Sequence, residues 1–305
     1  MINFELRIMK NIQKHLGYCL LVIGFVCVSC GPDARLDIPG MFSGSSPKID
    51  DRFEQSQEYN KTKELLILQA PTDEYHVYVC TDTHITKTQN LWTKFIDTYR
   101  NDMLCPVAVH LGDIIDAQNY FDEMYNAFQD VPLNPLKKDT LMAVAGNHDI
   151  YFKQWSKFLE IFKTCCYYFI VETPSGAKDL FICYDSADGT LGTKQLKWLR
   201  ETLEWADKQH FRHIIGCTHT HLFKRDASQG HTSNYTLEET YALLNLLTKH
   251  NVKMVWSGHD HSREITKVKG MTCIVVDSMK DEDKKPFYML VTMGDHIDYE
   301  FVAAK

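Results

Sequence analysis

The sequence predicts a mixed α/β (α+β) protein in which a two-sheet β-sandwich is flanked by helices. From about Glu74, short apolar runs alternate with amphipathic segments, a pattern that favours parallel strand pairing. The last sixty or so residues instead resemble successive antiparallel strands. A chain of 305 residues with 44% apolar and 24% charged residues is long enough to bury a sizeable core. One domain with two sheets accounts for both halves.

Each expected element rests on its local pattern. Apolar runs of strand length occupy His76–Thr81, Val107–Leu111, Leu141–Ala145, Tyr167–Val171, Leu180–Tyr184, His213–Cys217, Lys253–Trp256, Cys273–Val276 and Phe287–Thr292. Helical periodicity occupies Leu91–Arg100, Tyr120–Phe128, Gln154–Phe162, Thr193–Asp207 and Leu237–Lys249. Thr236 stands three residues before Glu239, which predicts a capping box at the start of the last helix.

The N-terminus resembles an export signal. Lys10 and Lys14 precede the apolar stretch Leu16–Val28, which is too short to span a membrane comfortably. Small residues then surround Cys30, as in a bacterial lipobox, where the cysteine becomes lipidated after cleavage. A plain signal peptide or a short membrane anchor are the alternatives. All three place the rest of the chain outside the cytoplasm, in the periplasm or on the outer surface.

These features predict a leader over residues 1–30, a tether over 31–70 and a folded domain over 71–305. The formal charge of −7 and the lack of a long basic run argue against a nucleic-acid polymer as partner. Ten cysteines would suit a disulfide framework, but several lie within apolar runs and are expected to be small buried hydrophobes. The protein is expected to contact the membrane through a lipid anchor at Cys30.

Polar clusters end five of the expected strands. They are Thr81-Asp82-Thr83-His84, Gly112-Asp113 with Asp116, Gly146-Asn147-His148-Asp149, His219 with His221, and His259 with His261. In open α/β folds, ligands bind at the carboxyl ends of strands, so the five clusters are expected to converge on one site. Imidazole, carboxylate and amide groups together suit zinc, iron or manganese.

The ordered set D-x-H, G-D, G-N-H-D, H and G-H-x-H resembles the calcineurin-like metallophosphoesterase superfamily over roughly residues 74–300. The resemblance implies a four-layer architecture and a site for two divalent ions (Mn, Fe or Zn). It assigns the first ion to Asp82, His84 and His261. It assigns the second ion to Asn147, His219 and His259, with Asp113 bridging the two.

The resemblance also implies catalytic roles near Asn147. His148 would protonate the leaving oxygen, Asp116 would pair with that histidine, and Asp149 would support the site. His221 stands where the family often has proline and is expected to be a loop residue. Each of these side chains has an ordinary alternative; Asp116 or Asp149, for example, would also suit a helix cap.

Differences between this sequence and the motifs of several family branches limit the class of expected substrate. Purple acid phosphatases have tyrosine at the position of Asp116, and serine/threonine protein phosphatases have arginine at that of Ala117. Lipid A precursor hydrolases have arginine at that of His148. The expected substrate is a small phosphate ester such as a nucleotide, glycerophosphodiester or lipid headgroup. The alternative is a surface-tethered metal-containing binding protein without significant turnover.

Overall fold

The computed structural model describes residues 47–116, 122–123, 127, 140–151, 154–223 and 235–305. The expected leader lies outside these residues, as does most of the expected helix over 120–128. Among the described residues, no helix combines the length and the apolar character that crossing a membrane requires. All seven cysteines in the described part of the chain are free and buried, which agrees with the expectation for those within apolar runs.

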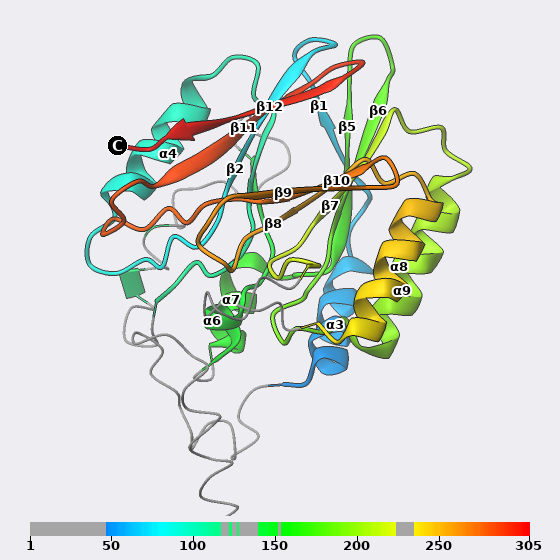
Figure 1. The fold of residues 1–305 in the computed structure, drawn as a ribbon, viewed down its shortest axis with the longest axis horizontal. Coiled ribbons are helices and arrows are strands. Elements are labelled where there is room, and N and C mark those ends of the chain that lie inside the picture. The colour runs from blue at the N-terminus through cyan, green and yellow to red at the C-terminus, as the bar shows by residue number, and fades with distance from the viewer. Residues whose placement is uncertain (1–46, 117–121, 124–126, 128–139, 152–153, 224–234) are drawn as a thin grey trace, which may run out of the picture.

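Two sheets form the centre of the molecule (Figure 1). The seven-stranded sheet has the order β1-β5-β6-β7-β8-β10-β9, and the five-stranded sheet has the order β12-β11-β2-β3-β4. The strands are β1 Leu66–Gln69, β2 Tyr75–Cys80, β3 Val107–His110, β4 Thr140–Ala143, β5 Tyr167–Glu172, β6 Lys178–Cys183, β7 His213–Cys217, β8 Met254–Ser257, β9 Glu264–Val268, β10 Met271–Val275, β11 Phe287–Met293 and β12 Ile297–Ala303.

Pairing directions follow the sequence pattern except between β8 and β10, which lie in the region expected to be antiparallel but pair parallel. Strands β2, β3 and β4 are parallel, as are β6, β7 and β8, whereas β11 pairs antiparallel with both β12 and β2. Strand β10 is parallel to β8 but antiparallel to β9. All nine expected strands are present, with ends that differ by up to two residues. Strands β1, β9 and β12 were not expected.

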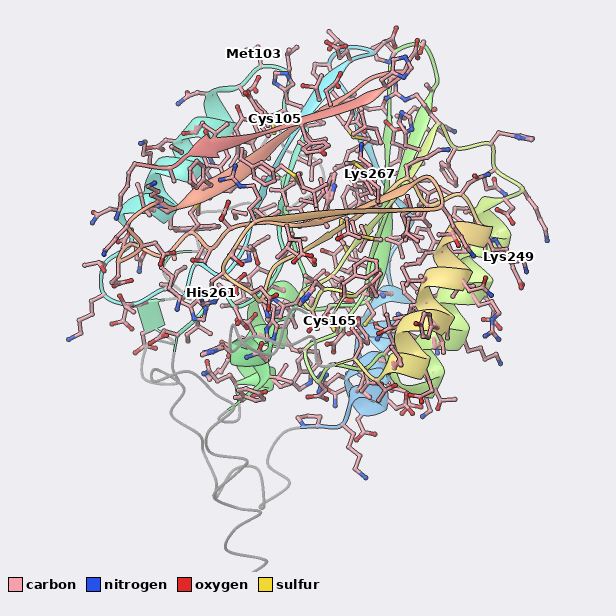
Figure 2. The ribbon with its side chains drawn as sticks, in the orientation of Figure 1. Met103, Cys105, Cys165, Lys249, His261 and Lys267 are labelled. Carbon is pink, nitrogen blue, oxygen red and sulfur yellow. The ribbon has the colours of Figure 1, made fainter. Side chains whose placement is uncertain are left out.

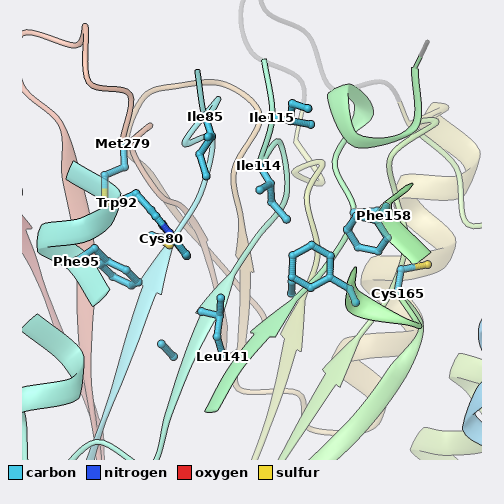
Figure 3. Close-up of a cluster of buried hydrophobic side chains, with 14 of the residues drawn as sticks. Cys80, Ile85, Trp92, Phe95, Ile114, Ile115, Leu141, Phe158, Cys165 and Met279 are labelled. Carbon is cyan, nitrogen blue, oxygen red and sulfur yellow. The ribbon is translucent and has the colours of Figure 1, made fainter. Parts of the chain in front are cut away.

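Helices cover the outer faces of both sheets, and this gives four layers. The helices are α3 Ile49–Asn60, α4 Asn90–Asn101, α6 Asn147–Ile150, α7 Trp155–Phe162, α8 Gly192–Ala206 and α9 Leu237–Lys249. Helix α4 packs on the five-stranded sheet, where Trp92 and Phe95 lie among residues such as Cys80 (Figure 3). Helices α8 and α9 pack on the seven-stranded sheet through Leu199, Leu203, Leu243 and Leu247.

The central core lies between the two sheets. It contains apolar side chains from both inner faces, among them Val77, Val109, Phe181, Trp256 and Met289, each at most 1% exposed. These strands alternate inward and outward side chains, and the inward set of each sheet removes the other from water. The packed sandwich is therefore the rigid frame that positions the loops at the strand ends.

The expected tether is wrong for the stretch from residue 49 to residue 69. Ile49–Asn60 forms α3, and Leu66–Gln69 forms the edge strand β1, parallel to β5. Helix α3 has few large apolar residues, and its periodic signal is weak. It is held instead by the buried guanidinium of Arg52, which bonds to Asp185, 133 positions later in the chain.

The expected capping box of α9 is half correct. The Thr236 hydroxyl accepts a hydrogen bond from the Glu239 backbone N–H at 3.2 Å. The Glu239 carboxylate, however, accepts from Leu191 N at 2.7 Å and from the Thr190 hydroxyl at 3.1 Å. It therefore joins α9 to the start of α8 rather than completing its own cap.

Candidate metal centre

The first polar clusters follow the ends of three neighbouring parallel strands, so they lie together at one end of the five-stranded sheet. Cys80 of β2 lies opposite His110 of β3, and His110 lies opposite Ala143 of β4. The site residues follow these strand ends within four positions: Asp82, Asp113 and Asn147. On the other sheet, β7 and β8 end two residues before His219 and His259. Figure 2 shows His261 at the end of the sheets where α6 lies.

The first group of ligand atoms comprises Asp82, His84, His261 and Asp113, and all lie within 4.8 Å of one another. His261 Nε2 is 3.2 Å from Asp82 Oδ1 and 3.2 Å from His84 Nε2. His84 Nε2 is 3.8 Å from Asp113 Oδ2. We refer to these four residues as the first half-site. Its side chains are almost fully buried except that of His261, which is 33% exposed.

The second group comprises Asp113, His219 and His259, with the Asn147 amide among them. Asn147 Oδ1 lies 3.1 Å from His219 Nε2 and 2.9 Å from His259 Nδ1. His219 Nε2 lies 3.4 Å from Asp113 Oδ2. We refer to these four residues as the second half-site. The structure thus brings together all seven residues expected as metal ligands.

Asp113 belongs to both half-sites, and its two oxygens have different environments. Oδ1 accepts a hydrogen bond from the His148 backbone N–H at 2.8 Å. Oδ2 lies 3.8 Å from His84 Nε2 and 3.4 Å from His219 Nε2. Asp113 is therefore the residue that would take part in holding both ions.

The backbone at the site adopts an uncommon conformation. Five of the seven expected ligands have positive φ: Asp82 (50°), His84 (42°), Asp113 (53°), His259 (74°) and His261 (52°). Such a conformation costs on the order of 1–3 kcal/mol for a residue with a side chain and persists only where the surroundings enforce it. Here it turns each side chain back toward the common centre just after its strand ends.

Metal ions fit the distances among these donors. Bonds of about 2.0–2.2 Å from zinc-like ions to nitrogen and oxygen place neighbouring ligand atoms about 3.0–3.5 Å apart. The closest donor pairs in both half-sites span 2.9–3.4 Å. Among the described residues, Asp82 Oδ1 is buried and finds no hydrogen-bond partner, which an ion would supply.

The charge balance also fits metal ions. Burial raises the pKa of Asp82, but the positive field of His261 outweighs burial and holds that pKa well below the usual value. The pKa of Asp113 is likewise well below its usual value despite burial, because His219 and His148 lie close. Burial lowers the pKa of His219, but the Asp113 carboxylate outweighs it and raises the pKa to about 10. The two buried carboxylates therefore favour positive charge at the cluster, which divalent ions supply.

His148 lies beside the first half-site and not within it. Its ring packs edge-on against the His84 ring with centroids 4.6 Å apart. Its Nδ1 lies 2.9 Å from the backbone carbonyl oxygen of Asp116 and donates to it, because a carbonyl only accepts. The expected pairing of His148 with the Asp116 carboxylate is therefore wrong in detail. That carboxylate lies 3.5 Å from His84 Nδ1, and the backbone of Asp116 contacts His148.

Asp149 positions two loops. It is 1% exposed, and its carboxylate accepts from Gly146 N at 2.8 Å and from Ile114 N at 2.9 Å. Burial and the negative charge of Asp113 raise the pKa of Asp149 to about 7. Since these bonds join the loop after β3 to that after β4, Asp149 holds Asp113 beside Asn147.

Two other histidines have structural partners. His221 Nε2 lies 3.2 Å from Asp260 Oδ2, so the histidine that replaces the family's proline joins two site loops. His110 Nδ1 accepts from Gly112 N at 3.1 Å, and its Nε2 bonds to the Thr83 hydroxyl at 2.9 Å. Both rings therefore connect neighbouring loops of the site.

Residues that the sequence did not single out complete the surroundings. The Ser186 hydroxyl accepts hydrogen bonds from the backbone N–H groups of His219 and Thr220. The hydrogen bond with His84 lowers the pKa of Asp116, and the positive charge of Lys280 adds to that effect. Neither Ser186 nor Lys280 lies in a family motif, so only the folded chain shows that they are near the site.

A two-sheet α/β sandwich that gathers two adjoining groups of His, Asp and Asn ligands at its strand ends has the architecture of a binuclear metal-dependent hydrolase. The model of the calcineurin-like phosphoesterase family matches residues 75–263, well over half of the chain. The chain belongs to this family, which is dimetal-dependent. Family and site together support phosphoester hydrolysis. No curated protein sequence matches the chain.

Solved structures share the fold. GAP50, described as the anchor in the inner membrane complex of Plasmodium, has a TM-score of 0.58 and 16% identity over 77% of this chain and 86% of that one. A dimetal phosphatase from Danio rerio has a TM-score of 0.56 and 13% identity, covering 76% and 96%. The purple acid phosphatase PPD1 from yellow lupin has a TM-score of 0.58 and 14% identity over 76% of this chain and 52% of that one. At such identities these similarities show the fold alone.

Proposed function

We propose that the protein is an exported hydrolase that cleaves small phosphate esters with two divalent ions, Mn, Fe or Zn. The observation that carries the proposal is the position of Asp113 Oδ2, which lies between His84 Nε2 and His219 Nε2 at 3.8 and 3.4 Å. When bound, two such ions activate water, hold the phosphate oxygens and neutralise charge in the in-line transition state.

His148 is the proposed acid for the leaving oxygen. With its Nδ1–H donated to the Asp116 carbonyl, Nε2 is the remaining ring nitrogen, so a proton held there is the one that is transferred. The edge-on contact with His84 keeps the ring beside the first half-site. A general acid in this position contributes roughly 10²–10⁴-fold to the rate.

The more exposed side of the cluster is the proposed substrate entrance. The side chains of His261 and Asp116 are 33% and 44% exposed, whereas those of Asp82 and His219 are fully buried. Lys280 acts electrostatically on both exposed groups. Its loop is fixed to the site because Met279 N donates to the backbone oxygen of Thr81 at 3.2 Å. Lys280 is therefore the proposed contact for a negative group of the substrate.

The proposed location is the periplasm or outer surface, with a lipid anchor at Cys30. The proposed substrates are nucleotides, glycerophosphodiesters or lipid headgroups, and no nucleic-acid polymer. The support is the basic and apolar N-terminal pattern and the overall negative charge. The test compares rates on an aryl phosphodiester and the matching monoester after metal removal and reloading with Mn or Zn. Faster diester cleavage directs the search to diesters, and a monoester preference directs it to phosphatase substrates.

A metal-containing binding protein is the second candidate function. The same fold occurs in GAP50, which is described as an anchor, so the fold alone does not require turnover. The complete ligand set and the position of His148 favour the enzyme, since a binding role does not need an acid beside the cluster. Absence of metal-dependent turnover on both ester types would favour the binding protein.

A further inference from the structure

Helix α3 precedes the residues matched by the family, yet it carries a fully buried arginine. Arg52 is 0% exposed, and its Nε donates to Asp185 Oδ2 at 2.8 Å. One terminal nitrogen donates to Asp188 Oδ2 and to the Pro47 carbonyl oxygen, both at 2.8 Å. A buried guanidinium with two carboxylates fixes both partners in place, because removing either leaves an uncompensated charge. Arg52 therefore attaches α3 to the loop after β6.

The loop that Arg52 holds contacts the second half-site directly. Ser186 follows Asp185, and its hydroxyl oxygen accepts from His219 N at 3.2 Å and from Thr220 N at 2.8 Å. The Thr218 hydroxyl donates to the same oxygen at 2.7 Å. Ser186 and the three residues that it contacts are 0% exposed. A continuous buried path thus runs from α3 to the backbone of a proposed metal ligand.

Two hydrogen bonds position His219, one to its ring and one to its backbone. Its Nδ1 donates to the Leu111 carbonyl oxygen at 2.9 Å, which leaves Nε2 for an ion. Its backbone N–H is held by Ser186. The ring direction therefore depends on the loop that Arg52 secures. The first half-site takes Asp82 and His84 from the loop after β2 and His261 from the loop after β8.

We propose that Arg52 is a positioning residue for the second half-site, acting through Asp185 and Ser186 on His219. This inference rests on the proposed two-metal site. Loss of the guanidinium leaves Asp185 buried without its cation, so the loop rearranges and Ser186 moves with it. Changes to groups that support a metal ligand typically weaken metal affinity by roughly 10–100-fold. The N-terminal helix is thereby part of the metal-binding unit.

The test measures the affinity of each ion in the full chain. Metal-free protein is titrated with Mn²⁺, and an Asn147→Ala variant identifies the binding step that belongs to the second half-site. Arg52→Gln is expected to weaken that step about tenfold or more and the other step less than threefold. The matched control is Lys194→Ala, which breaks the exposed ion pair between α8 and Glu54 of α3. It is expected to change neither step.

A second measurement separates positioning from general destabilisation. The rise in Tm on adding Mn²⁺ depends on the affinity of the folded protein for the ion, so a purely structural role of Arg52 lowers Tm but leaves the rise unchanged. The inference predicts a smaller rise in Arg52→Gln. Unchanged second-step affinity in a folded Arg52→Gln variant would overturn it.

Ser186→Ala tests the same path if Arg52→Gln does not fold. It removes only the hydroxyl that holds His219 N, and the inference predicts the same selective weakening of the second step. Normal binding of both ions by Ser186→Ala would overturn the inference. Failure of the wild-type protein to bind two ions would instead contradict the proposed function, so the two failures are distinguishable.

Discussion

Replacing Gly146 with alanine tests how closely the site is packed. A Cβ at this position would lie 2.2 Å from Asp113 N and 2.3 Å from Asp113 Oδ1, although real Cβ contacts essentially never fall below 3.0 Å. The backbone itself allows alanine, since φ is −100° and ψ is 179°. The obstacle is therefore steric, and the neighbouring atoms that must move belong to the bridging carboxylate.

The expected cost follows from that displacement. The loops must separate by about 0.8 Å to reach the 3.0 Å limit. A misplacement of about 1 Å at a reacting centre costs on the order of 100-fold in rate, and overpacking costs about 1–3 kcal/mol of stability. Gly146→Ala is therefore expected to lose at least about 100-fold in kcat and to bind metal more weakly, while remaining folded.

The assay compares this variant with Gly176→Ala in the turn between β5 and β6. Gly176 has a φ of +85°, and a Cβ added there would meet nothing within 4 Å. Alanine there adds about 1–2 kcal/mol of backbone strain at the opposite end of the strands. We expect it to lower Tm and leave kcat and metal content unchanged. Wild-type metal affinity and turnover in a folded Gly146→Ala variant would refute the steric reasoning.

Three further predictions concern single side chains. His148→Ala is expected to lower kcat by about 10²–10⁴-fold with two ions still bound, and an unchanged kcat would exclude it as the acid. Lys280→Ala is expected to raise KM about fivefold, the equivalent of roughly 1 kcal/mol for a solvent-facing ion pair, whereas Lys267→Ala on β9 leaves KM unchanged. Burial raises the pKa of Asp102, but the His76 hydrogen bond outweighs it and the net pKa is lowered. A carboxyl with a lowered folded-state pKa stabilises the fold above about pH 4, and this stabilisation is lost as the pH falls further. Asp102→Asn is therefore expected to lower the free energy of unfolding, measured in urea, at pH 7 and to lower it much less at pH 3. An equal loss at both pH values would contradict this.

The sequence predicted the site well because the signal for each ligand is local to a short stretch of the chain. Each polar cluster directly follows an apolar strand, and parallel strands bring their ends together, so the seven expected ligands converge. Spacing identifies such residues but not the direction of a side chain. The Asp116 carboxylate faces His84 rather than His148, and the Glu239 carboxylate faces Leu191 rather than its own cap. Those choices depend on neighbours brought close only by folding.

The N-terminal helix could not be predicted for a related reason. Its stability depends on Arg52 meeting Asp185 across 133 positions, and a local pattern of polar residues gives no sign of that pair. The same holds for Ser186, whose contact with His219 joins loops of two strands in the seven-stranded sheet. Long-range polar contacts of this kind leave no periodic signal in the sequence.

The most direct test of the central claim is a metal titration that follows bound ions and turnover together. Metal-free protein receives Mn²⁺ in steps while phosphate-ester hydrolysis is measured at each step. Two ions are expected to bind per chain, turnover is expected to rise with the second ion, and Asn147→Ala is expected to remove both the second step and the turnover. Hydrolysis that is complete with a single ion, or that persists without metal, would contradict a site in which Asp113 joins two half-sites.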